Sequence, residues 1–388
     1  MSSAAEPGDD IPEELLDAVE SVLGDKVEDV LEELADDSPD LEPYTPESAI
    51  DEFLESKRGD TVKSTRESYR TSLAHFVEFC EQNDINEMSE LTGSDLTRYR
   101  TYRREESCEE PLAPKTMKDE QWLMNAFISH LEAIDAVKPE LSDAVKIPDI
   151  DEEEEVRDEH LPRERQEQII DYLEQYRYAT AEHVTWLLLS VRGVRRCTVI
   201  ALDVEDFDPE ERKLELHHRP DQDTRLKNAR KSERHLSLPE HVAEVIEDFI
   251  ENNRHDVTDD YGRRPLLTSR YGRLSPSTIA KYVYKWSRPC VIQEGCPHGE
   301  NPEDCEAMEN ADAASKCPSS KSPHTVRKGY ITHHCKEGFP LEFLAEQADV
   351  SEDILRKHYD QSGKDDKRDL HERIFDEFYG DDEDGFYA

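Results

Sequence analysis

The run from Asp149 to Glu155 constrains the fold of this chain more than any other stretch, because all but one of its residues are acidic. Like charges at this density repel one another and disfavour packing, so the run is typical of an exposed linker. We therefore expect a domain boundary near residues 145–160, with residues 146–158 as an acidic linker. The segments on either side are each long enough to bury a hydrophobic core.

Acidic residues are also spread along the rest of the sequence. The 388 residues include 93 Asp and Glu against 48 Lys and Arg, which gives a formal net charge of −45. A protein this negative should be repelled by nucleic acid at low salt. Two interpretations stay open: a salt-adapted protein whose acidic surface leaves its fold and activity unchanged, or an acidic interaction protein that avoids DNA. Acidity in every segment, rather than in one tail, favours salt adaptation.

The ends of the chain carry weaker signals. No apolar run approaches the roughly 18 residues that a membrane span requires, and no basic stretch precedes an apolar one at the N-terminus. We therefore expect a cytoplasmic protein with no membrane partner. Residues 1–42 place apolar side chains at helical spacing in an acidic background, which predicts an acidic N-terminal segment that is helical or disordered. Residues 376–388 form an acidic tail.

Residues 43–145 follow a helical pattern throughout. Pro46 and Pro114 are typical first residues of helices, and Ser64 or Thr65 is a candidate cap for another helix. The apolar stripe that we expect on the last long helix contains Trp122, Leu123, Ala126, Phe127, His130 and Leu131. These signals predict a compact four-helix domain. Its candidate phosphate contacts are Arg66, Arg70, Lys115 and Lys118.

Residues 159–375 combine helical patterns with a short pair of strands. The apolar run Trp186–Leu189 indicates a buried helix, and the strands are expected around Leu214–Leu216 and Leu236–Leu238. Because strands occupy so little of the segment, the predicted class is mainly α with a small β-meander. Basic side chains gather against the acidic background in three clusters: Arg192–Arg196, Arg225–Arg234 and Ser322–Tyr330. Guanidinium groups match phosphate oxygens in pairs, so such clusters are typical of a phosphate site.

The first and third clusters resemble motifs of the tyrosine recombinases, the phage-type integrase family that includes the Xer-like enzymes. Gly193-Val194-Arg195 is similar to the Gly-Leu-Arg turn of that family, and Ala201-Leu202 follows where the family has the same pair. His324 and Arg327 resemble the family's His-x-x-Arg box. An ungapped count from that box places the family's tyrosine at Tyr359. This uninterrupted register is the strongest part of the resemblance.

The resemblance implies an N-terminal helical core-binding (SAM-like) domain followed by a catalytic domain over residues 159–375. It implies a site-specific recombinase that cleaves and rejoins double-stranded DNA through a 3′-phosphotyrosyl intermediate, as a tetramer on paired DNA sites and without a catalytic cofactor. In this interpretation Arg195 and Arg327 bind the scissile phosphate, and Tyr359 is the nucleophile. His324 would accept its proton. Lys227 would protonate the departing 5′ oxygen, and Lys231 is the alternative in the same turn.

Two positions depart from the family's pattern. Thr198 stands where the family often has an acid, and Val350 stands where it has a second His or Trp. Loss of that donor should weaken stabilisation of the transition state by about 2–4 kcal/mol unless another group replaces it. A catalytically weak DNA-binding relative with a regulatory role therefore stays open as an alternative. So does an acidic protein-interaction module.

Four of the eight cysteines fall in one segment, residues 288–320, which is poor in apolar residues and is expected to be an insertion. They are Cys290, Cys296, Cys305 and Cys317. In a cytosolic chain such a cluster favours a metal over disulfides, and zinc accepts four thiolates tetrahedrally. We therefore predict a structural zinc site, with free or partly paired thiols as the alternative. The segment resembles cysteine-bearing insertions in integrase-like proteins of halophilic archaea.

Overall fold

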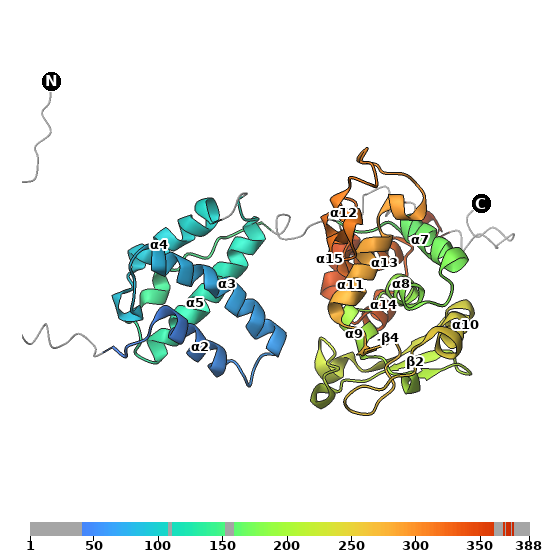
Figure 1. The fold of residues 1–388 in the computed structure, drawn as a ribbon, viewed down its shortest axis with the longest axis horizontal. Helices are drawn as coiled ribbons and strands as arrows, with labels where there is room; N and C mark the ends of the chain where they lie inside the picture. The colour runs from blue at the N-terminus through green and yellow to red at the C-terminus, as the bar shows by residue number, and fades with distance from the viewer. Residues whose placement is uncertain are drawn as a thin grey trace, which may run out of the picture. The chain divides into compact units, whose positions relative to one another are not determined.

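The computed structural model describes residues 41–107, 111–151 and 159–360, together with residues 368, 370–373 and 375. The chain divides into two compact units, residues 1–157 and 158–388 (Figure 1). Nearly all of the predicted acidic N-terminal segment, the whole tail from 376 to 388 and much of the predicted linker lie outside the described residues. None of the helices in the described part combines the length and apolar composition needed to cross a membrane.

The first unit is helical, as predicted. Its α-helices are α2 (Pro46–Ser56), α3 (Lys63–Gln82), α4 (Gly93–Thr101) and α5 (Pro114–Ala133). Pro46 and Pro114 begin their helices as expected, since proline lacks only an N–H that would have no partner in the first turn. The core is aromatic: Phe53, Phe76 and Phe127 are fully buried, and Phe127 meets the other two edge to face with ring centroids 5.5 Å and 6.0 Å apart.

Two local predictions for this unit are wrong. The helix α3 begins at Lys63 after Val62, without a side-chain cap, so Ser64 and Thr65 lie inside its first turn. On α5, Trp122 is 57% exposed, and the buried positions include Gln121 instead. Two other members of the expected stripe, Phe127 and Leu131, are buried as predicted, so the prediction fails for only part of the stripe.

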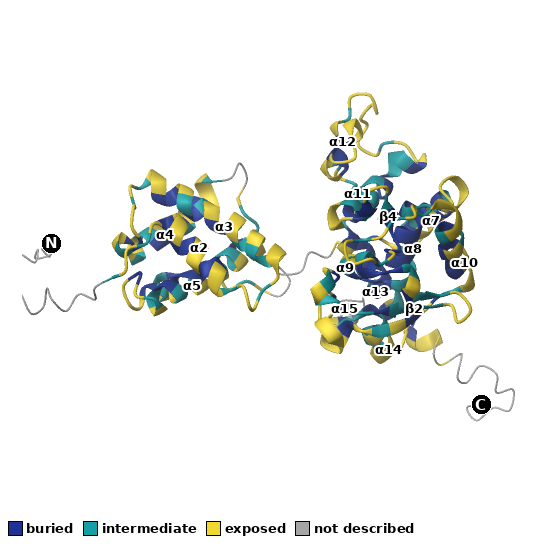
Figure 2. Ribbon diagram, turned by 60° about the horizontal axis from the view of Figure 1, so that its bottom comes forward, coloured by how far each residue is buried: buried dark blue, intermediate teal, exposed yellow. Residues whose placement is uncertain are grey.

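The second unit is built around α8 (Ala181–Arg192), of which all but the first residue and the last two are buried (Figure 2). Helices α7, α10, α11 and α13 all contact it. The remaining α-helices and their bounds are α7 (Arg163–Tyr176), α9 (Arg196–Ala201), α10 (Glu240–Asp248), α11 (Pro276–Trp286), α12 (Glu306–Glu309), α13 (Pro323–Lys336), α14 (Leu341–Ala348) and α15 (Glu352–Asp360). A mainly helical unit with little strand confirms the predicted class.

A three-stranded antiparallel sheet packs beside these helices. Its strands are β1 (Phe207–Asp208), β2 (Lys213–Leu216) and β3 (Arg234–Ser237), in that order. Leu214 pairs with Leu236, which confirms the predicted strand pair, and both side chains are fully buried. The pair β4 (Thr268–Ser269) and β5 (Gly272–Arg273) was not predicted, because two-residue strands are too short to show an alternating pattern.

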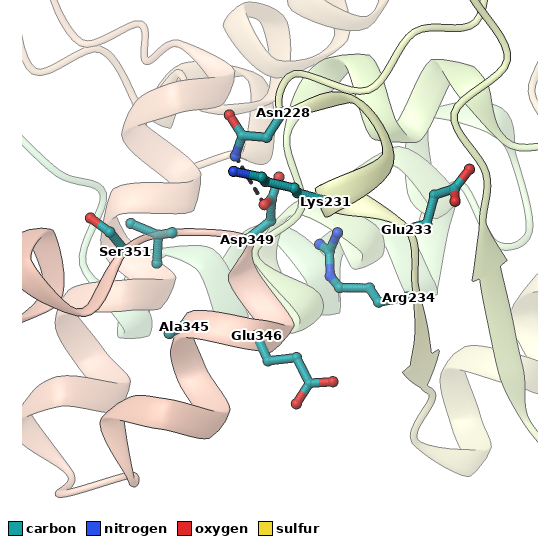
Figure 3. A pocket seen from close by; sticks show the side chains of 9 residues that line it. Asn228, Lys231, Glu233, Arg234, Ala345, Glu346, Asp349 and Ser351 are labelled. Carbon is teal, nitrogen blue, oxygen red and sulfur yellow. Dashed lines mark hydrogen bonds between the residues drawn. The ribbon is translucent and has the colours of Figure 1, made fainter.

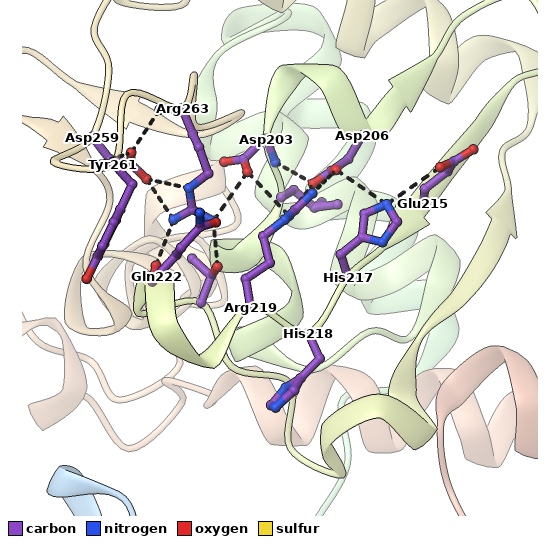
Figure 4. A network of polar contacts seen from close by, with 12 residues as sticks. Asp203, Asp206, Glu215, His217, His218, Arg219, Gln222, Asp259, Tyr261 and Arg263 are labelled. Atoms are coloured by element: carbon purple, nitrogen blue, oxygen red, sulfur yellow. Dashed lines mark hydrogen bonds and ion pairs between the residues drawn. The ribbon is translucent and has the colours of Figure 1, made fainter.

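The long connection from β2 to β3, residues 217–233, is held at its base by a buried ionic network (Figure 4). Arg219 binds both carboxylate oxygens of Asp206, at 3.0 Å and 2.5 Å, and lies 3.3 Å from Asp203. Arg263 donates to the Thr224 hydroxyl and to the Gln222 carbonyl, both at 2.8 Å. Buried charges persist when they are paired in this way. The network therefore anchors the start of the connection, which further along carries the exposed Lys227 and Lys231.

A buried histidine in α8 makes stability depend on pH. His183 is fully buried, and burial, followed by the nearby His241, lowers its pKa to about 4. The unfolded chain, with a histidine pKa near 6.5, binds this proton more readily than the folded chain does. The stabilisation is therefore complete above about pH 6.5 and is lost as the pH falls towards 4. We expect the free energy of unfolding to fall by about 3 kcal/mol over this window from this group.

Denaturant unfolding at pH 7 and at pH 5 measures the effect. The variant His183→Gln keeps a polar side chain that does not titrate, so its free energy of unfolding should depend less steeply on pH. If the free energy of unfolding depends on pH equally steeply in the variant and in the wild type, His183 is not the group responsible for the pH dependence.

Candidate active site

The first and third basic clusters meet in the second unit. Gly193 ends α8 in the left-handed conformation, with φ 59°, and Arg195 precedes the first turn of α9. The Gly193 carbonyl accepts a hydrogen bond of 2.5 Å from Nη1 of Arg327, which lies on α13 and is buried. A Cβ at Gly193 would overlap the ring of Tyr330, so glycine is needed both for the backbone conformation and for this close approach.

The electrostatics of this region join three of the predicted site residues. Burial lowers the pKa of Arg327, and the neighbouring Arg195 lowers it further. His324 stands in the first turn of α13, where partial burial and then the positive charge of Arg327 lower its pKa. A histidine with a lowered pKa is neutral at pH 7 and can accept a proton. The structure thus brings together Arg195, His324 and Arg327, in an environment that favours binding an anion.

The second cluster faces a cavity of about 740 Å³ between the β2–β3 connection and α14 (Figure 3). The residues that line it are Asn228, Lys231, Glu233, Arg234, Ala345, Glu346, Asp349, Val350 and Ser351. Lys227 and Lys231 are both exposed, and only Lys231 of the two is among the lining residues. Which lysine acts as the acid stays a prediction.

The two departures from the family's pattern occupy different environments. Val350, at the position where the family has a hydrogen-bond donor, lines the cavity. An isopropyl group offers no such donor. Thr198 lies buried in α9. Tyr359 lies on α15, which packs against α13, and its side chain is outside the part of the chain that the structure describes.

Sequence reasoning missed one residue that the structure places among these groups. Asp349 forms an ion pair with Arg195 and follows α14 in the left-handed conformation, with φ 52°. It also accepts hydrogen bonds from the Ser232 hydroxyl at 2.6 Å and from the Asn228 amide at 3.0 Å. Nothing in the spacing of a single aspartate among 93 acidic residues could have indicated this role.

Two further arginines belong to the same region. Arg234 donates two hydrogen bonds to the Gln347 carbonyl, at 3.2 Å and 2.9 Å, and Arg192 binds the Gln347 side chain. Burial lowers the pKa of both guanidinium groups. Both residues fell within the basic clusters of the sequence, so composition already pointed to the right segments. It did not point to α14 as their partner.

The predicted phosphate contacts of the first unit make contacts within the chain. Arg70 pairs with Asp51 at 2.7 Å, Lys115 pairs with Asp119 at 3.0 Å, and Arg66 donates to the Thr61 carbonyl. Arg70 and Lys115 are exposed, so binding an anion would cost little in lost ion pairing. A role for these residues, and for Lys118, in DNA binding stays a prediction.

The four clustered cysteines are half-buried free thiols. Burial raises the pKa of Cys290, the nearby Arg288 lowers it, and Cys317 and Cys296 raise it. Among the residues that the structure describes, however, no group of three or more His, Cys, Asp or Glu side chains is arranged to hold a metal ion. The insertion is anchored by the buried Arg288, whose Nη1 donates to the Ala307 carbonyl at 2.5 Å. Structural zinc stays a prediction.

Solved structures that share the fold of this chain include integrases. No protein-family model matches the chain, and no curated protein matches it. The Tn1549 transposon integrase in complex with transposon right end DNA has a TM-score of 0.58 at 14% identity, covering 85% of this chain and 99% of that one. A lambda integrase dimer bound to a COC′ core site has a TM-score of 0.58 at 12% identity, covering 91% and 86% respectively. The chain therefore shares the fold of tyrosine recombinases.

A third similar structure matches a smaller part of the chain. It is the N-terminal domain of a phage integrase/site-specific recombinase from Haloarcula marismortui, which is 33% identical, with a TM-score of 0.26. The match covers 28% of this chain and 99% of that domain. It is too short to bear on the chain as a whole.

Proposed function

We propose that this protein is a tyrosine recombinase that cleaves and rejoins duplex DNA through a 3′-phosphotyrosyl intermediate. The observation that carries the proposal is the meeting of Arg195, Arg327 and His324 from segments far apart in the sequence. Burying guanidinium groups is costly unless an anion or a dipole compensates for it. Two guanidinium groups held close together beside a neutral histidine, on a fold shared with integrases, are suited to a phosphodiester.

The reaction follows from the proposed groups. Arg195 and Arg327 hold the non-bridging oxygens and offset the charge that grows on them in the transition state. The Tyr359 hydroxyl attacks phosphorus, and its proton passes to the neutral His324. The bond from phosphorus to the 5′ oxygen breaks, and a lysine of the β2–β3 connection protonates that oxygen. The phosphotyrosyl bond keeps the energy of the phosphodiester, so rejoining needs no metal or nucleotide.

The assembly and the setting are part of the proposal. We expect the chain to act as a tetramer on paired DNA sites in the cytoplasm, and its acidic surface to suit a concentrated salt medium. Salt of about 1 M shortens the Debye length to about 3 Å, which removes repulsion between DNA and distant carboxylates. Salt screens the contacts between the arginines and the phosphate less, because these contacts lie inside the site, so the arginines still bind the phosphate.

The test is the capture of the covalent intermediate. Duplexes from the native genomic neighbourhood, nicked so that the cleaved end diffuses away, are incubated with the protein in high-salt buffer. We expect a covalent protein–DNA species whose attachment maps to the peptide containing Tyr359. Duplexes that bind without forming the adduct would instead support the catalytically weak DNA-binding relative, and Val350→His should then restore cleavage. Failure to bind any duplex would favour the acidic interaction module.

The two lysines can be separated by changing the leaving group. Lys227 directly follows the buried Leu226, whose backbone N–H is held by His218 at 3.0 Å, and we expect Lys227 to be the acid. Lys227→Ala should slow cleavage by about 10²–10⁴-fold on ordinary DNA. The Lys227→Ala variant should regain the wild-type cleavage rate on DNA with a 5′-bridging sulfur, because a thiolate leaving group does not need to be protonated. Lys231→Ala is the matched control, and the reverse pattern would assign the role to Lys231.

A further inference from the structure

One carboxylate is paired with an arginine of the proposed phosphate site. Asp349 accepts a hydrogen bond from the Asn228 amide at 3.0 Å (Figure 3). It also accepts one from the Ser232 hydroxyl at 2.6 Å and forms an ion pair with Arg195. Its side chain is only 12% exposed. The donors come from two separate segments of the unit, the turn that follows α8 and the β2–β3 connection.

These donors match what a phosphodiester would take. The two oxygens of Asp349 share one negative charge, as the two non-bridging oxygens of a phosphodiester do. A guanidinium, a hydroxyl and an amide N–H are groups that proteins commonly use to bind DNA phosphates. We propose that Asp349 is an internal surrogate for the scissile phosphate, which holds the site closed in the DNA-free chain and which DNA must displace. This inference rests on the proposed function, because it assigns Arg195 to the phosphate.

Displacement of Asp349 need not dismantle the surrounding structure. Arg234 donates to the Gln347 carbonyl at 2.9 Å and Arg192 binds the Gln347 side chain, and neither contact involves Asp349. The β2–β3 connection therefore stays attached to α14. The contacts that change are those of Asp349 with Arg195, Ser232 and Asn228.

The position of Asp349 links phosphate binding to the proposed nucleophile. Asp349 is the residue directly after α14, and α15, which carries Tyr359, begins at Glu352. A phosphate that takes over Arg195 frees the short turn between the two helices. Arrival of DNA then permits α15 to adjust at the moment when its tyrosine is needed, and the DNA-free chain keeps this turn fixed.

The variant Asp349→Asn tests the surrogate directly. Asparagine tolerates the left-handed conformation and nearly keeps the shape of aspartate, but it carries no charge. The matched control is Glu346→Gln, which removes the same charge from an exposed carboxylate that lines the same cavity. The probe is inorganic phosphate, titrated calorimetrically into the DNA-free protein at constant ionic strength.

We expect Asp349→Asn to bind phosphate about tenfold more tightly than wild type. If Asp349 occupies the site in about nine of ten wild-type molecules, the apparent affinity for phosphate is about tenfold lower than that of the open site. Glu346→Gln should change the affinity by less than about threefold, because an exposed charge is screened. Adding Arg195→Ala to Asp349→Asn should abolish the gain. Equal effects of Asp349→Asn and Glu346→Gln would overturn the inference.

Cleavage provides the second readout. At limiting DNA, Asp349→Asn should form the covalent adduct faster than wild type, and at saturating DNA the two rates should agree. A slower rate at saturating DNA would mean that Asp349 positions Arg195 during the reaction and is not displaced, which contradicts the proposal. A wild-type protein that forms no covalent adduct would contradict the proposed function. The phosphate titration needs no DNA cleavage, so it would still test whether Asp349 competes with phosphate.

Discussion

Replacing Tyr359 by phenylalanine is expected to abolish the covalent protein–DNA species while leaving duplex binding within about twofold of wild type. The substitution removes one hydroxyl oxygen, and without it no bond from protein to phosphorus can form. The measurement is a denaturing gel of nicked duplex incubated with each protein, beside a binding titration under the same salt.

Another tyrosine serves as the control for this experiment. Tyr271 is 82% exposed at the tip of the hairpin formed by β4 and β5, and no role in cleavage is assigned to it. Tyr271→Phe should form the adduct at the wild-type rate. An adduct that persists in Tyr359→Phe would mean that another residue is the nucleophile. The ungapped spacing from His324 to Tyr359 would then not identify the nucleophile.

The second large effect concerns the fold around Arg327. Gly329 lies two residues further along α13, and a Cβ there would overlap the Leu161 carbonyl oxygen and the Gln166 amide. The fully buried Gln166 donates to the Leu161 carbonyl at 2.8 Å and to the Val326 carbonyl at 3.2 Å. The chain segment before α7 therefore packs directly on the backbone of α13, which a side chain at this position would prevent.

Gly329→Ala should lower the free energy of unfolding by at least about 3 kcal/mol. Alanine is the better helix former by about 1 kcal/mol, so a net loss can come only from the overlap. For a unit of this size the melting temperature should fall by about 6–12 °C. Gly59→Ala is the control, because a Cβ there has nothing within 4 Å and the melting temperature should hardly move. A Gly329→Ala protein that melts like wild type would contradict the close packing of Leu161 on α13.

The sequence predicted the role of the first of these residues and not that of the second. Tyr359 was predicted from a register of motifs, without any knowledge of its surroundings. Gly329 follows the His-x-x-Arg box, but the sequence did not show why a glycine stands there. The explanation is a contact with Leu161, which is more than 160 residues away in the chain.

The amino-acid sequence by itself determined the helical class, the starts of α2 and α5, and the pairing of β2 with β3. Proline at a first helical turn and alternating leucines are local signals, and they act through the nearest few residues. It also identified the segments that carry Arg195, His324 and Arg327. Their types and spacing point to phosphate chemistry, because that chemistry restricts which side chains can serve.

Only the tertiary structure decided which groups meet. The exposure of Trp122, the ion pair between Asp349 and Arg195 and the cavity beside Lys231 all depend on contacts between distant segments. An acidic residue among 93 has no distinguishing pattern, and its role follows from the donors that the fold places around it. Burial and electrostatic contacts depend on residues that are neighbours in space, so they cannot be predicted from the local sequence.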